Sequence, residues 1–233
     1  MASWETRGPL ARRREWALAK SDAGVQVQNV EQTEHGNGRG STKNAIYEAA
    51  LDAFAEKGYS GASLRDIAQR VGVEVASLYN HISSKESLLF VIIMQTSREL
   101  YDALDEAREE VSGGDELEAM RAVVRRHLVF NVTHSRHNFV GTVELRALTP
   151  EHRREAVAIR GKVEGIYKEL VERCVAAGRL PANTSVTVAA YQLIALSMGV
   201  SDWFREGGEL TVEEIADFTI DFIEHGLHPR SPR

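Results

Sequence analysis

Apolar residues recur at helical spacing along almost the whole chain after residue 41, and no stretch alternates in the manner of a β-strand. Glycines, prolines and capping residues divide this pattern into segments. The predicted helices span 42–58, 63–71, 75–81, 85–111, 115–133, 138–148, 149–177, 185–205 and 211–226. The pattern therefore predicts an all-α fold of about nine helices.

The stretch from Ser63 to Leu89 has the spacing of two short helices around a tight turn. Ser63 and Asp66 form a capping box at the start of the first helix, and Gly72 directly after it suits a left-handed turn. The second short helix, 75–81, is apolar on one face and polar on the other. This arrangement is typical of a helix-turn-helix, whose second helix lies in the major groove of DNA.

The same residues resemble the N-terminal DNA-binding signature of TetR-family transcriptional regulators. The matching motif consists of Ile67-Ala68, Val71-Gly72-Val73, Ser77-Leu78-Tyr79-Asn80-His81-Ile82, Ser84-Lys85-Glu86 and Leu88-Leu89, preceded by the helix Ala49 to Tyr59. The resemblance covers about Lys43 to Met94. It implies a ligand-responsive DNA-binding regulator, most often a repressor, in which the last two helices pair with their mates in a homodimer.

Four regions follow from these patterns. We expect a flexible N-terminal extension at 1–41, a helix-turn-helix DNA-binding domain at 42–89, a helical ligand-binding and dimerisation domain at 90–228, and a C-terminal tail at 229–233. The extension is assigned from its turn-rich end, Gly36 to Ser41.

The matched positions imply two sets of DNA contacts. Phosphate contacts fall to Tyr79, His81 and Lys85, with Ser63 as a cap that can also touch the DNA backbone, and base reading falls to Arg65, Val75, Ala76, Ser77 and Asn80. An alternative to a disordered extension is an arm of Arg12 to Arg14, Arg39 and Lys43 that touches DNA phosphates or the minor groove. The predicted recognition helix holds no Lys or Arg. We therefore expect DNA shape or bridging water to carry part of the specificity.

The distribution of charge along the chain changes the expected source of DNA affinity. The formal net charge is −6, but the first 90 residues hold eleven Lys/Arg and eleven Asp/Glu. The DNA-binding part is thus neutral and the remainder is acidic. Affinity for DNA must come from a few well-placed groups and helix ends rather than from a strong positive field.

The helix predicted at 185–205 is apolar nearly all round, and the helix at 211–226 is strongly amphipathic. A helix that is apolar on all sides must be buried on all sides. Because both helices lie at the end of the chain, we expect a second subunit to cover them, which agrees with the resemblance. Packing within one monomer is the alternative.

A ligand cavity among the C-terminal helices is implied by the resemblance. Its candidate residues are Phe130, His134, Phe139, Val143, Glu144, Tyr167, Met198 and Trp203, with His127 as a further polar anchor. The stretch Trp203 to Thr211 is similar to one in TetR-like repressors of steroid and fatty-acid breakdown, which respond to acyl-CoA thioesters. The implied effector is a small apolar compound or an acyl-CoA, although the carboxylate of Asp202 would repel a CoA phosphate.

The sequence gives little support for a metal site, a reactive cysteine or catalysis. His134 and His137 are spaced like metal ligands, but the helical register breaks near them, so we predict no metal and no cofactor. Cys174, the single cysteine, lies on an apolar stripe and is expected to be inert. No catalytic motif is present, so we predict that the chain is not an enzyme.

The longest apolar run, Leu88 to Met94, is seven residues, which is too short to span a membrane, and no secretory signal follows the N-terminal arginines. We therefore expect a cytoplasmic protein. One functional alternative stays open: a dimeric ligand-binding or scaffold protein with a degenerate helix-turn-helix.

Overall fold

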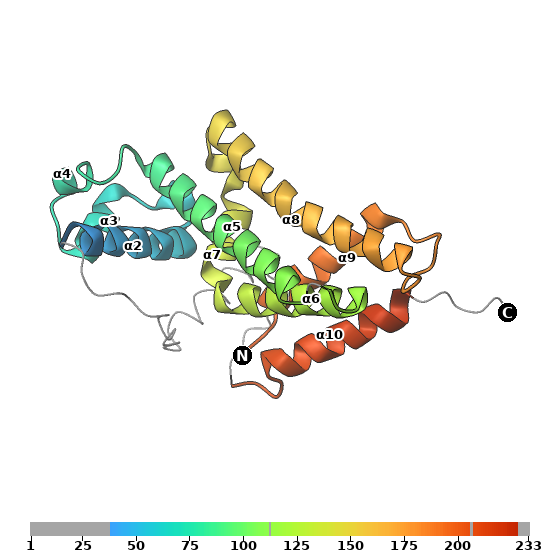
Figure 1. Cartoon of the computed structure of the whole chain (residues 1–233). Coiled ribbons are helices and arrows are strands. Elements are labelled where there is room, and N and C mark those ends of the chain that lie inside the picture. Colours follow the sequence, from blue (N-terminus) through green and yellow to red (C-terminus); the bar gives the residue numbers. More distant parts are fainter. Residues whose placement is uncertain (1–37, 112, 206, 228–233) are drawn as a thin grey trace. The chain divides into compact units, whose positions relative to one another are not determined.

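The structure, a computed structural model, describes residues 38–111, 113–205 and 207–227. These ranges contain nine α-helices and two 3-10 helices, and no strand. The α-helices are α2 (Gly38–Gly61), α3 (Leu64–Val71), α4 (Val75–Leu78), α5 (Lys85–Glu110), α6 (Glu116–Thr133), α7 (Ser135–Val143), α8 (Pro150–Ala176), α9 (Val186–Gly199) and α10 (Val212–Leu227), and the 3-10 helices are η2 (Leu145–Ala147) and η3 (Val200–Asp202) (Figure 1). The predicted all-α class is confirmed.

The predicted ends of the chain fall mostly outside this description. Residues 1–37 of the expected extension and the expected tail at 229–233 are not among the described residues. Helix α2 begins at Gly38, inside the predicted extension. None of the helices in the described ranges is long and apolar enough to cross a membrane.

Gly58 interrupts α2 where the sequence predicts its end. Its backbone has φ 73° and ψ 162°, and the helical hydrogen bonding resumes for a short turn to Gly61. A positive φ of this kind is accessible to glycine at little cost. The residue therefore separates the long part of α2 from the turn that leads to α3.

Two helices of the C-terminal half differ from the prediction. The helix predicted at 138–148 begins earlier, at Ser135, and ends at Val143 before the 3-10 turn η2. Only His134 separates it from α6, because the Thr133 hydroxyl and the His134 N–H both donate to the Phe130 carbonyl and close the last turn. The helix predicted at 185–205 ends as α9 at Gly199 and continues as η3.

The chain folds as two compact units. Of the described residues, the first unit comprises 38–96 and 136–156, and the second comprises 97–111, 113–135, 157–205 and 207–227. All three junctions fall inside helices: α5 is divided after Thr96 and α8 after Ala156, whereas α7 has only its first residue, Ser135, on the other side of the junction.

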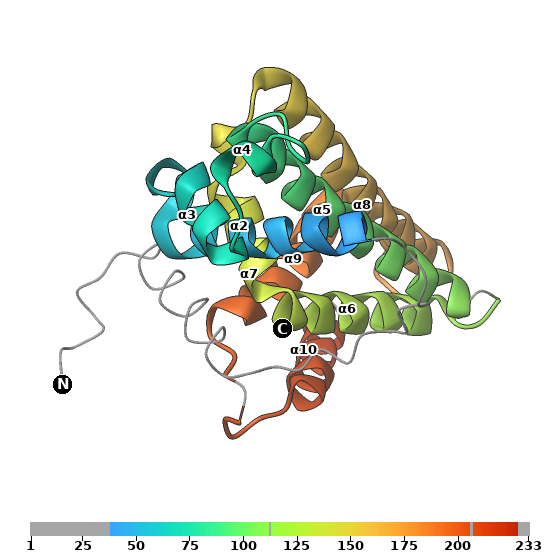
Figure 2. The same ribbon diagram turned by 90° about the vertical axis from the view of Figure 1, so that its left-hand side faces the viewer.

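In the first unit α2 packs on α3 and α3 packs on α4 (Figure 2). Its core is formed by apolar side chains that are completely buried, which include Ile46, Phe54, Ile67, Leu78 and Leu88. Burial of these side chains is the main term that stabilises the short helices α3 and α4, which are too short to be stable alone.

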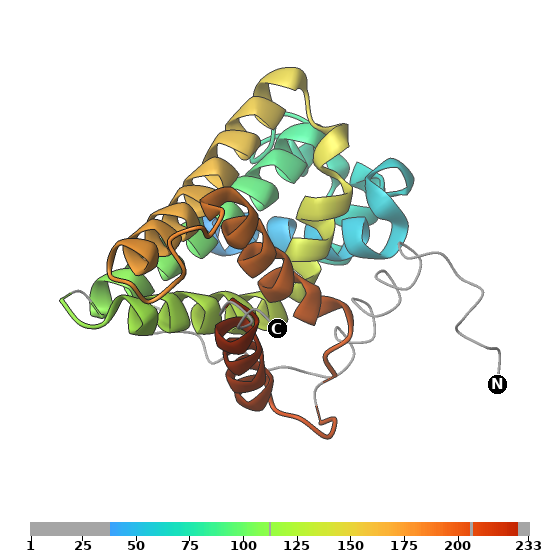
Figure 3. The ribbon, with the colours of Figure 1, turned by 90° about the vertical axis from the view of Figure 1, so that its right-hand side faces the viewer.

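In the second unit α6 packs against both α9 and α10 (Figure 3). Met120, Val123, Val124 and Leu128 of α6 are buried in this core, together with Leu170 of α8. The apolar residues that recur at helical spacing in α6 thus form its buried face.

Candidate nucleic-acid interface

Ser63 starts α3 in the way that the sequence predicts. The Asp66 N–H donates to Ser63 Oγ at 3.1 Å, and the Ser63 N–H donates to Asp66 Oδ2 at 2.9 Å. Lys57 Nζ also binds the Asp66 carboxylate, at 2.5 Å. This hydrogen bond with Lys57, followed by the bonds with Ser63, holds the pKa of Asp66 far below its usual value. Ser63 is therefore engaged in the cap, whatever further contact it makes.

The turn between α3 and α4 depends on Gly72, whose φ is 77° and whose N–H donates to the Ala68 carbonyl at 2.9 Å. This left-handed C-cap ends α3 after Val71 and directs the chain into α4. The helix-turn-helix predicted from the sequence is thus formed.

Helix α4 is fixed by Leu78, which is completely buried. The residues around it lie toward solvent: Ala76 and Asn80 are exposed, and Tyr79 keeps 57% of its surface accessible. Val75, Ser77 and His81 are half-buried. The predicted base-reading and phosphate-binding residues of this segment therefore form the solvent-accessible, outer surface of α4 and the turn after it, and none of them is Lys or Arg.

The turn after α4 is closed by backbone hydrogen bonds. The N–H groups of His81 and Ile82 donate to the Leu78 carbonyl at 2.8 and 3.0 Å. Ser84 and Ser87 then cap α5 reciprocally, with each N–H bound to the other hydroxyl. As a result, α4 is joined tightly to the start of α5.

Lys85 has a structural role that the sequence did not reveal. Its Nζ donates to the carbonyls of Tyr59 and Ala62, both at 2.8 Å, and lies 4.4 Å from the centroid of the Tyr59 ring. An ammonium group has three donors, so one N–H remains for a phosphate. The predicted phosphate contact stays a prediction, and Lys85 in addition fastens α5 to the α2–α3 connection.

Lys43 and Arg65 are both exposed, on α2 and α3 respectively. Lys43 Nζ lies 5.5 Å from the centroid of the Tyr47 ring on the same helix. Both exposed cations therefore remain candidates for the predicted DNA contacts.

The candidate ligand residues are divided between the two units. Phe139, Val143 and Glu144 belong to the first unit, and Phe130, His134, Tyr167, Met198 and Trp203 belong to the second. In the first unit Glu144 Oε1 accepts the Tyr59 N–H at 3.0 Å, while Phe139 and Val143 are half-buried. The Glu144 carboxylate thus holds backbone of the helix-turn-helix region.

In the second unit a cluster of polar side chains is buried. His127 Nδ1 lies 2.8 Å from the Tyr167 hydroxyl, and Asn131 Nδ2 donates to the Ser197 carbonyl at 3.0 Å. Burial lowers the pKa of His127 to about 3 and raises that of Tyr167 well above its usual value, so both are uncharged at neutral pH. Asn131 and Ser197 were missed, although Asn131 stands one helical turn after His127.

The remaining candidates of the second unit differ in exposure, since Phe130 is buried and His134 is half-buried. The Phe130 and His134 rings stack at 4.0 Å between centroids. Met198 is exposed, and Trp203 keeps 55% of its surface accessible. These two side chains therefore lie on the outside of this unit, and their predicted contact with a ligand is untested.

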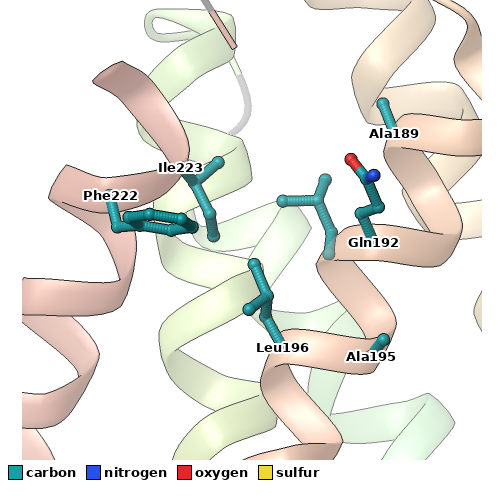
Figure 4. Close-up of a pocket in the computed structure, with 7 residues that line it drawn as sticks. Ala189, Gln192, Ala195, Leu196, Phe222 and Ile223 are labelled. Atoms are coloured by element: carbon teal, nitrogen blue, oxygen red, sulfur yellow. The ribbon is translucent and has the colours of Figure 1, made fainter. Parts of the chain in front are cut away.

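An apolar surface runs along α9 and α10. Phe218 is 74% exposed and Phe222 is 58% exposed, with Val188, Tyr191 and Leu196 exposed on α9. Between the two helices lies a groove of about 400 Å³, into which Phe222, Ile223 and Leu196 project (Figure 4). Within the single chain, helix α9 is thus buried on one side only, and its expected cover by a second subunit stays a prediction.

Within the described ranges, no group of three or more His, Cys, Asp or Glu side chains has the arrangement of a metal site. The Cys174 thiol is buried, and burial raises its pKa to about 11, which keeps it protonated and unreactive. The Sγ–H donates to the Glu116 carbonyl at 3.4 Å.

Two family models match the chain. Residues 46–92 match the model described as bacterial regulatory proteins of the tetR family, and residues 113–227 match the model described as the tetracyclin repressor-like C-terminal domain. The first match covers the helix-turn-helix and the second covers α6 to α10.

Individual proteins are similar over most of the chain. The HTH-type transcriptional repressor KstR2 of Rhodococcus jostii (strain RHA1) is 25% identical over 195 residues, which cover 82% of this chain and 93% of that protein. The crystal structure of the TetR-family regulator PfmR from Thermus thermophilus is 29% identical, with a TM-score of 0.71, and covers 79% of this chain and 99% of its own. AibR, solved in complex with isovaleryl coenzyme A and operator DNA, is 26% identical with a TM-score of 0.71, covering 78% and 97%.

Proposed function

Because the chain belongs to the TetR family of transcriptional regulators, which bind DNA and are not enzymes, we propose that it is a homodimeric repressor released from its operator by a small-molecule effector. The observation that carries the proposal is the outer surface of α4, fixed from behind by buried Leu78 and presenting small and polar side chains.

The DNA-binding step follows from this surface. Helix α4 enters the major groove, where Ser77 and Asn80 meet base edges and Ala76 meets a thymine methyl. Tyr79, His81 and the remaining N–H of Lys85 contact phosphates. Two copies bind half-sites about 34 Å apart, one helical turn of DNA.

The apolar surface of α9 and α10 supports the homodimer. Aromatic side chains as exposed as Phe218 and Phe222 are unfavourable in water, and a patch of this kind marks an interaction site. A second copy related by a twofold axis presents the same surface, so that the aromatic side chains of each α10 enter the groove of the other.

The proposed effector is an acyl-CoA thioester. Support comes from AibR, which was solved with isovaleryl coenzyme A, and from the resemblance of residues 203–211 to acyl-CoA-responsive repressors. The ligand would shift the population of dimers away from the half-site spacing that fits the operator. Asp202, which would repel a CoA phosphate, is exposed on η3 and is the residue to test first.

The test is an electrophoretic shift assay with the promoter DNA that flanks the protein's own gene, repeated with isovaleryl coenzyme A. We expect specific retention that is weakened by the thioester and by Tyr79→Ala. The DNA assignment fails if specific DNA is not retained at moderate salt. The effector assignment alone fails if retention is specific but does not change with acyl-CoA esters of any chain length.

One observation favours the alternative of a ligand-binding or scaffold dimer that no longer reads DNA. The recognition helix carries no cation, and two of the three donors of Lys85 are already used. The salt dependence of DNA binding separates the two functions, because each phosphate contact releases counterions and steepens the slope. A flat dependence supports the scaffold.

A further inference from the structure

Glu86 lies in the first turn of α5, directly after Lys85, and its side chain is only 18% exposed. Its Oε1 accepts the Thr149 N–H at 2.9 Å, and both carboxylate oxygens lie within 2.9 Å of His152 Nδ1. Thr149 and His152 belong to the start of α8, where unpaired N–H groups need acceptors. One carboxylate from α5 therefore caps the beginning of α8.

An aromatic contact reinforces this connection one turn further along α5. The Phe90 ring stacks on the His152 imidazole with centroids 3.8 Å apart and planes inclined by 8°. The start of α8 is thus attached to the first two turns of α5 by hydrogen bonds and by stacking.

On its other side, the start of α5 is attached to the DNA-reading elements. Lys85 binds the carbonyls of Tyr59 and Ala62, and the closed turn after Leu78 joins α5 to α4. Helix α4 and the first turn of α5 therefore move together. Glu86 therefore connects the start of α8 to the elements that hold the recognition helix.

Two further contacts hold the same segment. Arg136 at the start of α7 pairs with Asp52 of α2, and Glu144 accepts the Tyr59 N–H. Both contacts link residues 136–156 to α2 and to the connection after it. Glu86 differs from them because it lies at the start of α5, the helix that follows the recognition helix in the chain.

We propose that Glu86 is a positioning residue for DNA binding, which fixes α4 to the beginning of α8. Helix α8 continues without a break past Ala156 into the second unit, where Tyr167 belongs to the buried polar cluster. A ligand that displaces α8 there would thereby turn the recognition helix. The role rests on the proposed homodimeric function, because the position of α4 matters most when two half-sites must be met at once.

The experiment measures how operator affinity depends on half-site spacing. The wild-type protein first selects its operator from random DNA, and affinity is then measured with the half-sites moved apart by one or two base pairs. For the wild type we expect operator affinity to be highest at one half-site spacing and to decrease sharply at the others. Glu86→Ala should flatten this optimum, reducing the preference for the best spacing on the order of tenfold, while its affinity for a single half-site stays unchanged.

Three variants show whether the effect belongs to this contact. Glu86→Gln keeps an acceptor for Thr149 and should retain most of the optimum. His152→Phe keeps the stacking on Phe90 but loses the hydrogen bond, so it should flatten the optimum and add little to Glu86→Ala. Glu56→Ala breaks an ion pair with Arg70 between α2 and α3, away from α8, and should leave the optimum intact.

The proposal is overturned if Glu86→Ala keeps the wild-type optimum or if Glu56→Ala flattens it equally. If Glu86→Ala does not fold, His152→Phe decides the question alone. If the wild type itself shows no optimum, the homodimeric function fails, and hydrogen exchange decides the role of Glu86 separately. Amides of residues 75–84 should then exchange faster in Glu86→Ala, and unchanged exchange would refute the role.

Discussion

The two compact units both have an apolar core, but they differ in the side chains that they expose and in the polar groups that they bury. In the first unit the outer surface around α4 is small and polar, and the residues behind it, such as Leu78 and Leu88, are apolar. In the second unit Phe218 and Phe222 face outward, whereas His127 and Asn131 are buried in the interior.

This difference indicates the chemistry of each unit's partner. A polar outer surface over an apolar core is stable in water and suits a polar, hydrated ligand such as DNA. An exposed aromatic surface is stabilised only when another apolar surface covers it. The buried polar cluster, in turn, is tolerated because its members are hydrogen-bonded to one another.

The largest effect is expected when charges are introduced into the exposed aromatic surface of α10. Phe218→Glu with Phe222→Glu should dissociate the dimer and lower operator affinity on the order of a thousandfold, since the second half-site is no longer held by a linked partner. Sedimentation and fluorescence anisotropy measure the two effects. Glu213→Gln on the exposed face of α10 serves as control, and a dimer that survives both charges would refute this surface as the interface.

Removing the apolar support of α4 should have the next largest effect. Leu78→Ala leaves a cavity behind the recognition helix and should lower the free energy of unfolding by about 3 kcal/mol. Urea denaturation measures the loss, with Ala76→Ser on the exposed side as the control. A loss below about 1 kcal/mol would mean that Leu78 does not anchor the helix.

The buried imidazole predicts a dependence of stability on pH. His127 has a pKa of about 3 when folded and near 6.5 when unfolded, so below pH 6.5 the unfolded chain binds a proton that the folded chain does not. Stability should fall as the pH decreases from 6.5 toward 3, by about 2 kcal/mol at pH 5 from this group. Urea unfolding at pH 5 and at a pH above 6.5, with His127→Gln as reference, measures this loss of stability. Equal pH dependence in both proteins would exclude His127 as the source.

A change on the outer surface of α4 should cause the smallest change in the free energy of DNA binding and no change in the free energy of unfolding. Tyr79→Ala removes an exposed ring and the proposed phosphate contact, so operator affinity should decrease about tenfold while the melting temperature is retained. Anisotropy at two salt concentrations checks whether the salt slope decreases by about one contact. A lower melting temperature would instead show that Tyr79 supports the fold.

The sequence predicted those features whose signals are local. The cap formed by Ser63 and Asp66 and the left-handed Gly72 each depend on neighbours within a few residues, and both are present in the structure. Family membership, suggested by the motif around these residues, agrees with the matched models. The end of α6 at residue 133 was predicted, but the start of α7 directly after His134 was not, because it depends on the hydrogen bonds that close the last turn of α6.

Long-range contacts explain what the sequence could not predict. Glu86 meets Thr149 and His152, which are more than 60 residues away along the chain. Lys85 could be matched to a phosphate contact by resemblance, but its bonds to Tyr59 and Ala62 follow only from the packing of α5 on the turn after α2. Periodicity shows that a helix has an apolar face, but it does not show which element covers it.

The unbroken course of α5 and α8 across the junctions restricts how this protein can be recombined with its relatives. Each residue inserted into an α-helix rotates everything that follows by about 100° and advances it by about 1.5 Å. A chimera joined after Thr96 or Ala156 must therefore keep the helical phase of both parents. A chimera joined at His134 does not interrupt a helix, because this residue lies between α6 and α7, and the requirement does not apply there. Natural insertions and deletions are expected to be absent from the middle of both helices and to collect in the connections between the others.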